Sequence, residues 1–227
     1  MNIGVHLASY EYIYIIDSDD HMTDDGVELI YNWIKTIDGD NGFAGVSGLR
    51  GKNKSEFIGQ YPNHQEYIDA TNLDRKKSKL MGDKAEVYKK DILIKYPFPE
   101  FEEERFIEES VVWDKIAFDG FKIRWFNEVI CICEYLEDGL TKNLSDTVRL
   151  DNFEGYTLLE KQNFMFRKFP HNYLSIGRYL SLAKHKGYDR ADVIKNLEIN
   201  NLDYFVGRLF GVLRNVIKGI KYNERIK

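Results

Sequence analysis

The 227-residue sequence predicts an α/β fold, with a sheet and flanking helices, followed by a helical C-terminal region. Residues 10–16 are nearly all β-formers, and a short continuous apolar run predicts a strand buried on both faces. Amphipathic stretches alternate with further short apolar runs, as in layered α/β proteins. From about Thr147 onward the pattern is helical. We therefore expect a first domain over residues 1–143 and a helical region over residues 144–227.

The elements are expected in a definite order. Residues 2–9 are interpreted as the end of a helix, because Ile3 and Leu7 are four positions apart. The strand at residues 10–16 is expected to be central, with neighbours on both sides. The remaining elements are a helix at residues 24–37 capped by Thr23, a strand at 43–49, a long surface loop at 50–80, a short helix at 85–94, a helix at 105–118 and strands at 121–126 and 129–135.

Composition and charge exclude several classes of protein. The net charge of −5 argues against a nucleic-acid-binding protein. Cys131 and Cys133 lie two positions apart in an apolar run, so on a strand they share a face. We interpret them as reduced core residues rather than as metal or redox residues. Reduced cysteines are typical of cytosolic proteins. The start resembles no secretory signal, and no window approaches the ~20 apolar residues of a membrane span.

An acidic cluster, Asp17-Ser18-Asp19-Asp20, directly follows the first predicted strand. Ligands of open α/β sheets bind beyond the carboxyl ends of strands. Asp17 and Asp19 can face one ligand from an extended turn, and two carboxylates suit Mg²⁺ or Mn²⁺. Such a metal ion can hold a diphosphate. The alternative is that the acidic turn caps a helix, with Asp20 as the capping residue.

Two other charged clusters have open interpretations. Glu108 and Glu109 lie at the start of the expected helix, where acidic residues interact favourably with the helix dipole. A carboxylate there is also suited to be the general base for a sugar acceptor. The basic run from Arg75 to Lys79 is either a solvated loop or a contact for phosphate.

The stretch at residues 204–227 combines apolar residues with six basic residues and one acid, Glu224. A basic amphipathic pattern predicts a helix lying on a membrane surface. The alternative is a helix that packs its apolar face on the rest of the protein.

A set of ordered motifs carries a family resemblance. The motifs are Asn2-Ile3-Gly4, Ala8-Ser9, Glu11-Tyr12-Ile13, Asp17-Ser18-Asp19-Asp20, Gly82-Asp83-Lys84-Ala85-Glu86-Val87-Tyr88, Phe106-Ile107-Glu108-Glu109-Ser110-Val111-Val112-Trp113 and Tyr135-Leu136-Glu137-Asp138-Gly139-Leu140-Thr141. In this order they resemble family 2 glycosyltransferases of the GT-A fold, of a bacterial cell-surface polysaccharide type. The resemblance covers about residues 2–143 and implies a Rossmann-like mixed sheet with flanking helices.

The resemblance also implies roles for single residues. Asp19 would ligate the divalent metal, Mn²⁺ or Mg²⁺, and Asp17 would contact the ribose or, through water, the metal, with Ser18 between them in the nucleotide-binding motif. Glu109 would deprotonate the acceptor hydroxyl, with Glu108 as the second choice. The implied reaction moves a sugar, with inversion, from a nucleotide-sugar donor to a glycan or lipid-linked acceptor. Separately from the resemblance, the reduced cysteines and the basic stretch at residues 204–227 predict a cytoplasmic protein that is peripheral at the inner face of the cell membrane.

Two departures from the family pattern shape these expectations. The family begins with a strand and a helix that cradle the nucleotide base, and this sequence starts after them, so we expect an N-terminally incomplete fold that binds nucleotide sugars weakly. Many relatives also supply a late histidine to the metal, whereas none lies between His64 and His171. The rival hypothesis is a catalytically impaired remnant that acts as a glycan-binding or partner subunit. A phosphatase would require Thr or Val at position 21, which is His.

Overall fold

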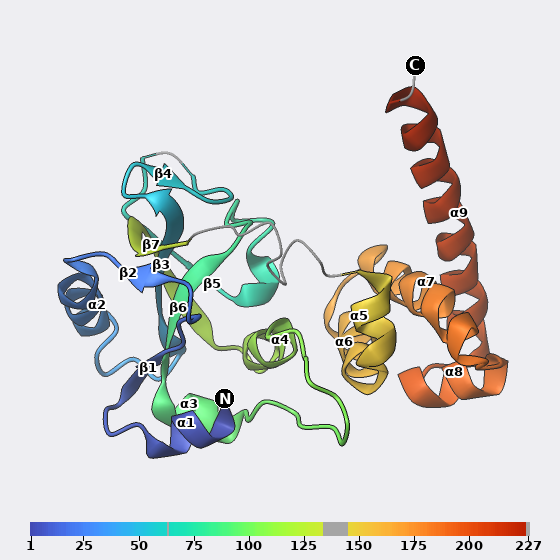
Figure 1. Ribbon diagram of the computed structural model, residues 1–227, viewed down its shortest axis with the longest axis horizontal. Coiled ribbons are helices and arrows are strands. Elements are labelled where there is room, and N and C mark those ends of the chain that lie inside the picture. The colour runs from blue at the N-terminus through green and yellow to red at the C-terminus, as the bar shows by residue number, and fades with distance from the viewer. Residues whose placement is uncertain (63, 134–144, 226–227) are drawn as a thin grey trace. The chain divides into compact units, whose positions relative to one another are not determined.

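The computed structural model describes residues 1–62, 64–133 and 145–225, with side chains of the last helix described through Ile217 (Figure 1). The described chain forms two compact units. The first comprises Met1–Phe98 and Val112–Gly139, and the second comprises Pro99–Val111 and Leu140–Lys227. The expected boundary between residues 143 and 144, and the family motif at residues 135–141, lie outside the described residues.

One mixed sheet forms the centre of the first unit. Its strands are β1 (Tyr12–Tyr14), β2 (His21–Met22), β3 (Phe43–Asn53), β4 (Glu56–Phe57), β5 (Tyr67–Ala70), β6 (Lys84–Lys89) and β7 (Lys122–Ile132). The main order is β1-β6-β3-β7-β2, with β4 paired to β3 and β5 paired to β7. β3 and β7 run parallel, and the pairings made by β1, β2, β4, β5 and β6 are antiparallel.

Helices cover both faces of this sheet. They are α1 (Asn2–Leu7), α2 (Gly26–Lys35), α3 (Lys90–Lys95) and α4 (Ser110–Phe118). On one face, Trp33 of α2 packs in a cluster with Val46 and Ile130 of the sheet. On the other face, α1, α3 and α4 contribute to a second cluster. In this cluster the Trp113 ring stacks on the Tyr88 ring, with the ring centroids 4.1 Å apart. The predicted layered α/β arrangement is confirmed.

The first strand differs from its prediction. β1 pairs only with β6, places Ile13 opposite Tyr88, and lies at the edge of the sheet. Its side chains are half-buried, and Ile16 and Tyr10 are 40% and 83% exposed. The prediction of a central strand covered on both faces is therefore wrong for the described chain. An apolar run indicates a tendency to be buried, but the number of neighbouring strands depends on residues far away in the sequence.

Two segments adopt strand structure where the sequence predicted otherwise. The predicted helix at residues 85–94 is the strand β6 followed by the helix α3, because β6 has a pairing partner on each side, β1 and β3. The predicted loop at residues 50–80 contains β4 and β5, and β5 pairs with β7. The two strands expected after residue 120 form one strand, β7, whose predicted continuation to residue 135 lies outside the described residues.

The predicted helix at residues 105–118 begins later, at Ser110. The side-chain oxygen of Asn152 accepts hydrogen bonds from the backbone N–H groups of Arg105 and Phe106, both at 2.9 Å. The carboxylate of Glu104 accepts from the backbone of residues 154 and 155. These long-range contacts hold the segment before Ser110 in a non-helical conformation.

The second unit is helical, as the sequence predicted. Its helices are α5 (Asp146–Asp151), α6 (Phe153–Phe166), α7 (His171–Ala183), α8 (Arg190–Leu197) and α9 (Asn201–Arg225). Their core includes stacked aromatic rings and one buried ion pair. Glu160, only 2% exposed, accepts two hydrogen bonds from the guanidinium of Arg178, at 2.6 and 2.5 Å.

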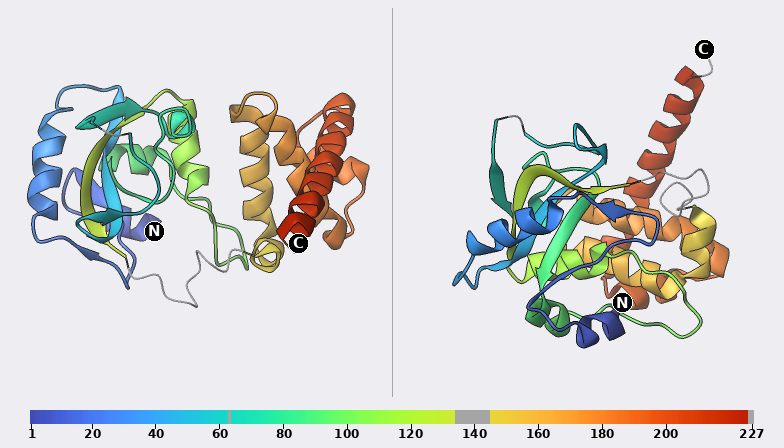
Figure 2. Two further views of the ribbon diagram at one scale, coloured as in Figure 1. Left: turned by 90° about the horizontal axis from the view of Figure 1, so that it is seen from above. Right: turned by 60° about the vertical axis from the view of Figure 1, so that its left-hand side comes forward.

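The last helix, α9, packs on α7 with one face and exposes apolar side chains on the other. At the crossing, a Cβ on Gly177 would lie 2.7 Å from the backbone of Gly211, so the two helices approach closely. Figure 2 shows α9 continuing past the helices on which it packs. The exposed apolar residues are Leu202, Phe205, Leu209, Val212, Leu213, Val216 and Ile217. Within the described parts of the chain, no helix combines the length and apolar character needed to cross a membrane.

Candidate functional site

The candidate site begins in the turn that follows β1. Asp17, Ser18 and Asp19 are exposed there, and Asp20 is half-buried. The turn is closed by a backbone hydrogen bond from Asp20 N–H to the carbonyl of Asp17, at 3.2 Å. The chain then enters β2, which pairs with the end of β7. The predicted carboxylates are thus at the end of a strand, on an accessible surface.

Arg50, near the end of β3, organises this turn. Its Nη1 atom donates to Oδ2 of Asp20 at 2.7 Å and to Oδ2 of Asp17 at 3.2 Å. Its Nε atom donates to the carbonyl of Lys84 at 3.0 Å. The Arg50 and Asp20 side chains are 16% and 7% exposed, whereas the Asp17 side chain is 64% exposed. Arg50 therefore positions Asp17 through a contact on one carboxylate oxygen, while that side chain stays open to solvent.

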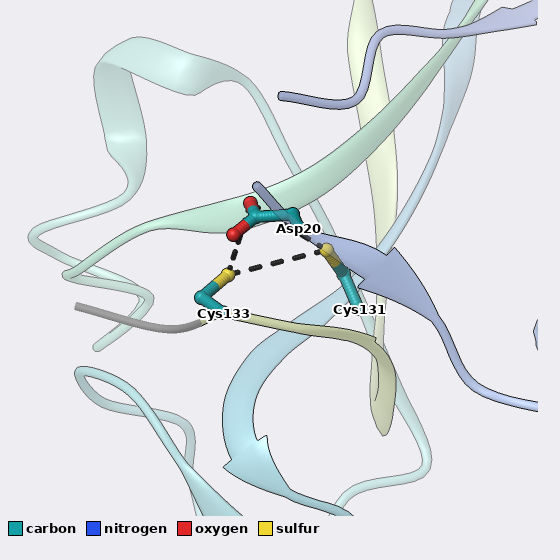
Figure 3. Close-up of side chains that lie close together, drawn as sticks. All are labelled: Asp20, Cys131 and Cys133. Atoms are coloured by element: carbon teal, nitrogen blue, oxygen red, sulfur yellow. Dashed lines mark hydrogen bonds between the residues drawn. The ribbon is translucent and has the colours of Figure 1, made fainter. Parts of the chain in front are cut away.

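Two thiols lie against Asp20 on the side of β7 (Figure 3). The Cys133 thiol donates to Oδ2 of Asp20 at 3.2 Å, and the two sulfur atoms are 4.0 Å apart. Both cysteines are free and buried. Burial raises the pKa of the Cys131 thiol and raises that of Cys133 to about 12, so both are protonated thiols at neutral pH. Both side chains are buried, as predicted for core residues.

The donor set of the turn fits a hard divalent cation. Asp17 and Asp19 offer exposed carboxylate oxygens, the ligand type that Mg²⁺ and Mn²⁺ prefer. Mg²⁺ is usually bound through one or two carboxylates together with substrate phosphates, so a complete protein cage is not required. The positive charge of Arg50 next to Asp17 weakens cation binding there and makes Asp19 the stronger candidate ligand.

The second candidate group, Glu108 and Glu109, belongs to the second unit. Glu109 is exposed and directly precedes α4. Glu108 is half-buried and accepts a hydrogen bond from Nη2 of Arg149 at 3.5 Å. Burial raises the pKa of the Glu108 carboxyl, and the Arg149 charge offsets only part of that effect. A raised pKa suits a proton-transfer group, whereas accessibility to a substrate favours Glu109.

Arg75, the first residue of the basic run at residues 75–79, has a structural role. Arg75 donates through Nε to the carbonyl of Leu80 at 3.1 Å and through Nη2 to the carbonyl of Gly82. Its guanidinium also lies 5.1 Å from the centre of the Trp125 ring. The nearby Lys84 is 2% exposed, and its amine donates to the carbonyl of Met81 at 3.0 Å. Arg75 is therefore held by its own loop rather than presented to solvent.

Sequence reasoning located the acidic turn but missed the groups that hold it. Arg50 follows an apolar run and precedes Gly51, and a cation at the end of a buried strand is the signal that would have identified it. The contact of Asp20 with the thiols joins residues more than a hundred positions apart, for which the sequence contains no local signal.

Comparisons with known proteins bear on the fold. No protein-family model and no curated protein sequence matches this chain. The crystal structure of S. aureus TarS 1–349 in complex with UDP superposes with a TM-score of 0.51 at 14% identity, covering 89% of this chain and 54% of that one. A second crystal structure of S. aureus TarS 1–349 has a TM-score of 0.48 at 14% identity and covers 85% of this chain and 52% of that one. A crystal structure of S. aureus TarS has a TM-score of 0.48 at 15% identity and covers 84% of this chain and 31% of that one.

The chain therefore spans about half of the length of the TarS 1–349 structures that it resembles. TarS is a glycosyltransferase. At 14% identity the likeness concerns the fold alone. Together with the mixed sheet and its flanking helices, it confirms the predicted architecture: this chain has a Rossmann-like α/β fold, which it shares with the TarS structure.

Proposed function

We propose that this chain is a glycosyltransferase that moves a sugar from a nucleotide-sugar donor to a hydroxyl group of a glycan or lipid-linked acceptor. The observation that carries the proposal is the exposed Asp17-Ser18-Asp19 turn at the end of β1, in a chain that shares its fold with the TarS structure. The UDP in the crystal structure of the neighbour TarS supports a nucleotide-linked donor.

In this proposal, Asp19 and Asp17 hold Mn²⁺ or Mg²⁺, and Ser18 belongs to the segment that contacts the nucleotide. The metal ion, when bound, neutralises negative charge on the departing diphosphate. Arg50 keeps Asp17 oriented through the 3.2 Å contact. Glu109 accepts the proton of the acceptor hydroxyl as the oxygen attacks the anomeric carbon, with inversion, and Glu108 is the second choice for this role.

Metal binding by the turn is tested by titration with Mn²⁺, followed by the loss of the electron paramagnetic resonance signal of the free ion. We expect Asp19→Ala to weaken binding at least tenfold, because it removes the carboxylate without a neighbouring cation. Asp24→Ala is the matched control, since Asp24 is also exposed and lies five residues away. Equal affinities for wild type and Asp19→Ala would reject the assignment.

A second candidate function is that of a partner or glycan-binding subunit without transfer activity of its own. One observation favours it: β1 leaves one edge of the sheet without a strand partner among the described residues. Measured hydrolysis or transfer of a nucleotide sugar by the purified chain would exclude this alternative. Glycan binding without either reaction would support it.

We also propose that α9 contacts the surface of an anionic membrane, which would place the protein at the inner, cytoplasmic face. The exposed apolar residues of α9 support this, together with the six basic residues and single acid of residues 204–227. Each Lys or Arg near an anionic surface contributes about 1 kcal/mol, and salt weakens the attraction.

Point variants test the membrane contact better than a deletion, because α9 also packs on α7. Leu209→Asp and Val216→Asp, at exposed positions, should reduce co-sedimentation with vesicles that contain anionic lipid. Val27→Asp, at a position 69% exposed on α2, is the matched control. Equal sedimentation of all variants, or sedimentation that salt does not weaken, would reject this contact.

A further inference from the structure

A triangle of potential metal ligands lies beside the acidic turn. Among the residues that the structure describes, one group brings three such side chains close enough to bind a single ion. It consists of Asp20, Cys131 and Cys133. Oδ2 of Asp20 lies 3.2 Å from Sγ of Cys133 and 3.9 Å from Sγ of Cys131, and the two sulfur atoms are 4.0 Å apart. In Figure 3 both thiols extend from the end of β7 toward the carboxylate.

The sheet itself brings these three side chains together. Cys131 lies in β7, and Cys133 directly follows the last residue of that strand, so the two alternate residues place their side chains on the same face. β2 pairs with this part of β7, with Met22 opposite Cys131. Asp20 directly precedes β2 and is thereby held against the thiols. Backbone pairing therefore brings the three side chains close together.

The size of the triangle matches tetrahedral coordination by zinc. Two sulfur atoms, each about 2.3 Å from a tetrahedral zinc ion, lie about 3.8 Å apart, and a sulfur and a carboxylate oxygen lie about 3.5 Å apart. The observed edges of 4.0, 3.2 and 3.9 Å each differ from these values by about 0.4 Å or less. Small side-chain rotations would be sufficient for all three atoms to bind one ion.

Charge and the surrounding groups are consistent with such an ion. Two thiolates and one carboxylate carry three negative charges, which a divalent cation and the guanidinium of Arg50 balance. Arg50 donates to Oδ2 of Asp20 at 2.7 Å, and its positive charge opposes a cation less here than at Asp17, because the two thiolates add negative charge. The buried hydroxyl of Tyr14 lies near Cys131, and a thiolate at Cys131 would accept a hydrogen bond from it.

We propose that Asp20, Cys131 and Cys133 form a binding site for a thiophilic divalent cation such as zinc. Both thiol protons leave to solvent as the two sulfur–metal bonds form, and a water molecule completes the coordination. The ion would connect the acidic turn to the end of β7 and so restrict the position of Asp17 and Asp19. The site is chemically distinct from the proposed oxygen-only site of those two residues, and its existence does not depend on transfer activity.

Cobalt titration tests the site, because sulfur-to-cobalt charge-transfer bands require thiolate ligands and the chain contains only these two cysteines. The full chain, reduced with a phosphine and freed of metal, should develop these bands with one equivalent of Co²⁺, and Zn²⁺ should displace the cobalt. Cys131→Ser and Cys133→Ser should each weaken the bands and lower the affinity at least tenfold. Asp19→Ala should leave the bands unchanged, which separates this site from the proposed Mn²⁺ site.

A measurement on the wild-type protein covers the case in which a serine variant fails to fold. X-ray absorption of the zinc-loaded chain should show two sulfur neighbours at about 2.3 Å. Absence of charge-transfer bands, or zinc with only oxygen and nitrogen neighbours, would overturn the proposal.

Discussion

Replacement of Arg50 by methionine should destabilise the first unit strongly. Methionine has a similar length but no charge, so the change leaves the carboxylate of Asp20 without its cation. The Asp20 side chain is 7% exposed, and its 2.7 Å contact with Nη1 of Arg50 is then lost. The hydrogen bond from Nε of Arg50 to the carbonyl of Lys84 is lost as well.

The expected magnitude follows from the burial of the pair. Removing one member of a buried ion pair costs about 3–5 kcal/mol, because the remaining charge stays desolvated. Arg50 is 16% exposed, so water can partly solvate the site, and we expect a loss near the lower limit, about 3 kcal/mol. With a urea m-value of about 2 kcal/mol/M, the unfolding midpoint should fall by about 1.5 M.

Tryptophan fluorescence gives a selective assay. The chain has three tryptophans, Trp33, Trp113 and Trp125, and all of them are buried in the first unit. Urea unfolding followed by their emission therefore reports on this unit. Lys52→Met is the matched control: it removes the same charge from the pair of Lys52 and Glu56, whose side chains are 63% and 56% exposed. An exposed ion pair of this kind contributes about 0–1 kcal/mol to the free energy of unfolding.

A double-mutant cycle isolates the pair. Asp20→Asn combined with Arg50→Met should cost less than the sum of the two single changes, by about 1–3 kcal/mol, because the double variant has no unpaired buried charge. If Arg50→Met and Lys52→Met have the same small effect, or if the two changes at the pair are additive, the reasoning about a buried ion pair is refuted.

Three further predictions concern catalysis, pH and packing. Glu109→Gln should lower sugar transfer roughly 10²-fold or more with unchanged folding, measured as nucleoside diphosphate release, whereas Glu102→Gln, at an exposed turn, should not. Burial, and then the charge of Arg75, lowers the pKa of Lys84 to about 8 from 10.5, so the stability that neutral Lys84 contributes is present above pH 10.5 and is lost as pH falls through 8. As pH falls from 10.5 to 8, the free energy of unfolding of Lys84→Met should therefore rise by about 3 kcal/mol relative to wild type, measured by urea unfolding, and a pH-independent difference would contradict this. Gly177→Ala should destabilise the second unit by about 1–3 kcal/mol, because the new Cβ would lie 2.7 Å from the backbone of Gly211. Gly4→Ala is the control, because the space around Gly4 is open and no loss of stability is expected. Thermal unfolding followed by far-ultraviolet circular dichroism compares the two variants.

The candidate site was predictable where its signal is local. Asp17 and Asp19 follow an apolar run within a few residues, so the sequence alone indicated carboxylates at the end of a strand. The helical character of the second unit is likewise a local pattern, repeated every three to four residues along the chain. The alternation of apolar runs and amphipathic stretches was sufficient to predict a layered α/β fold.

Other features depend on partners that are distant in the sequence. β1 is an edge strand because the order of the sheet places it next to β6 only, and β6 is a strand because it has partners on both sides. The helix α4 begins at Ser110 because Asn152 binds the backbone just before it. No pattern within one segment encodes these contacts, since each depends on which other segment lies alongside.

The same distinction separates the two parts of the site. The sequence by itself determined that acidic residues follow the first strand and that two cysteines share a face of the last one. Only the tertiary structure decided that Arg50 pairs with Asp20 and that Asp20 lies against both thiols. The physical reason is that side-chain chemistry and short-range periodicity are properties of the chain, whereas charge pairing and ligand geometry arise when β2, β3 and β7 meet in one sheet.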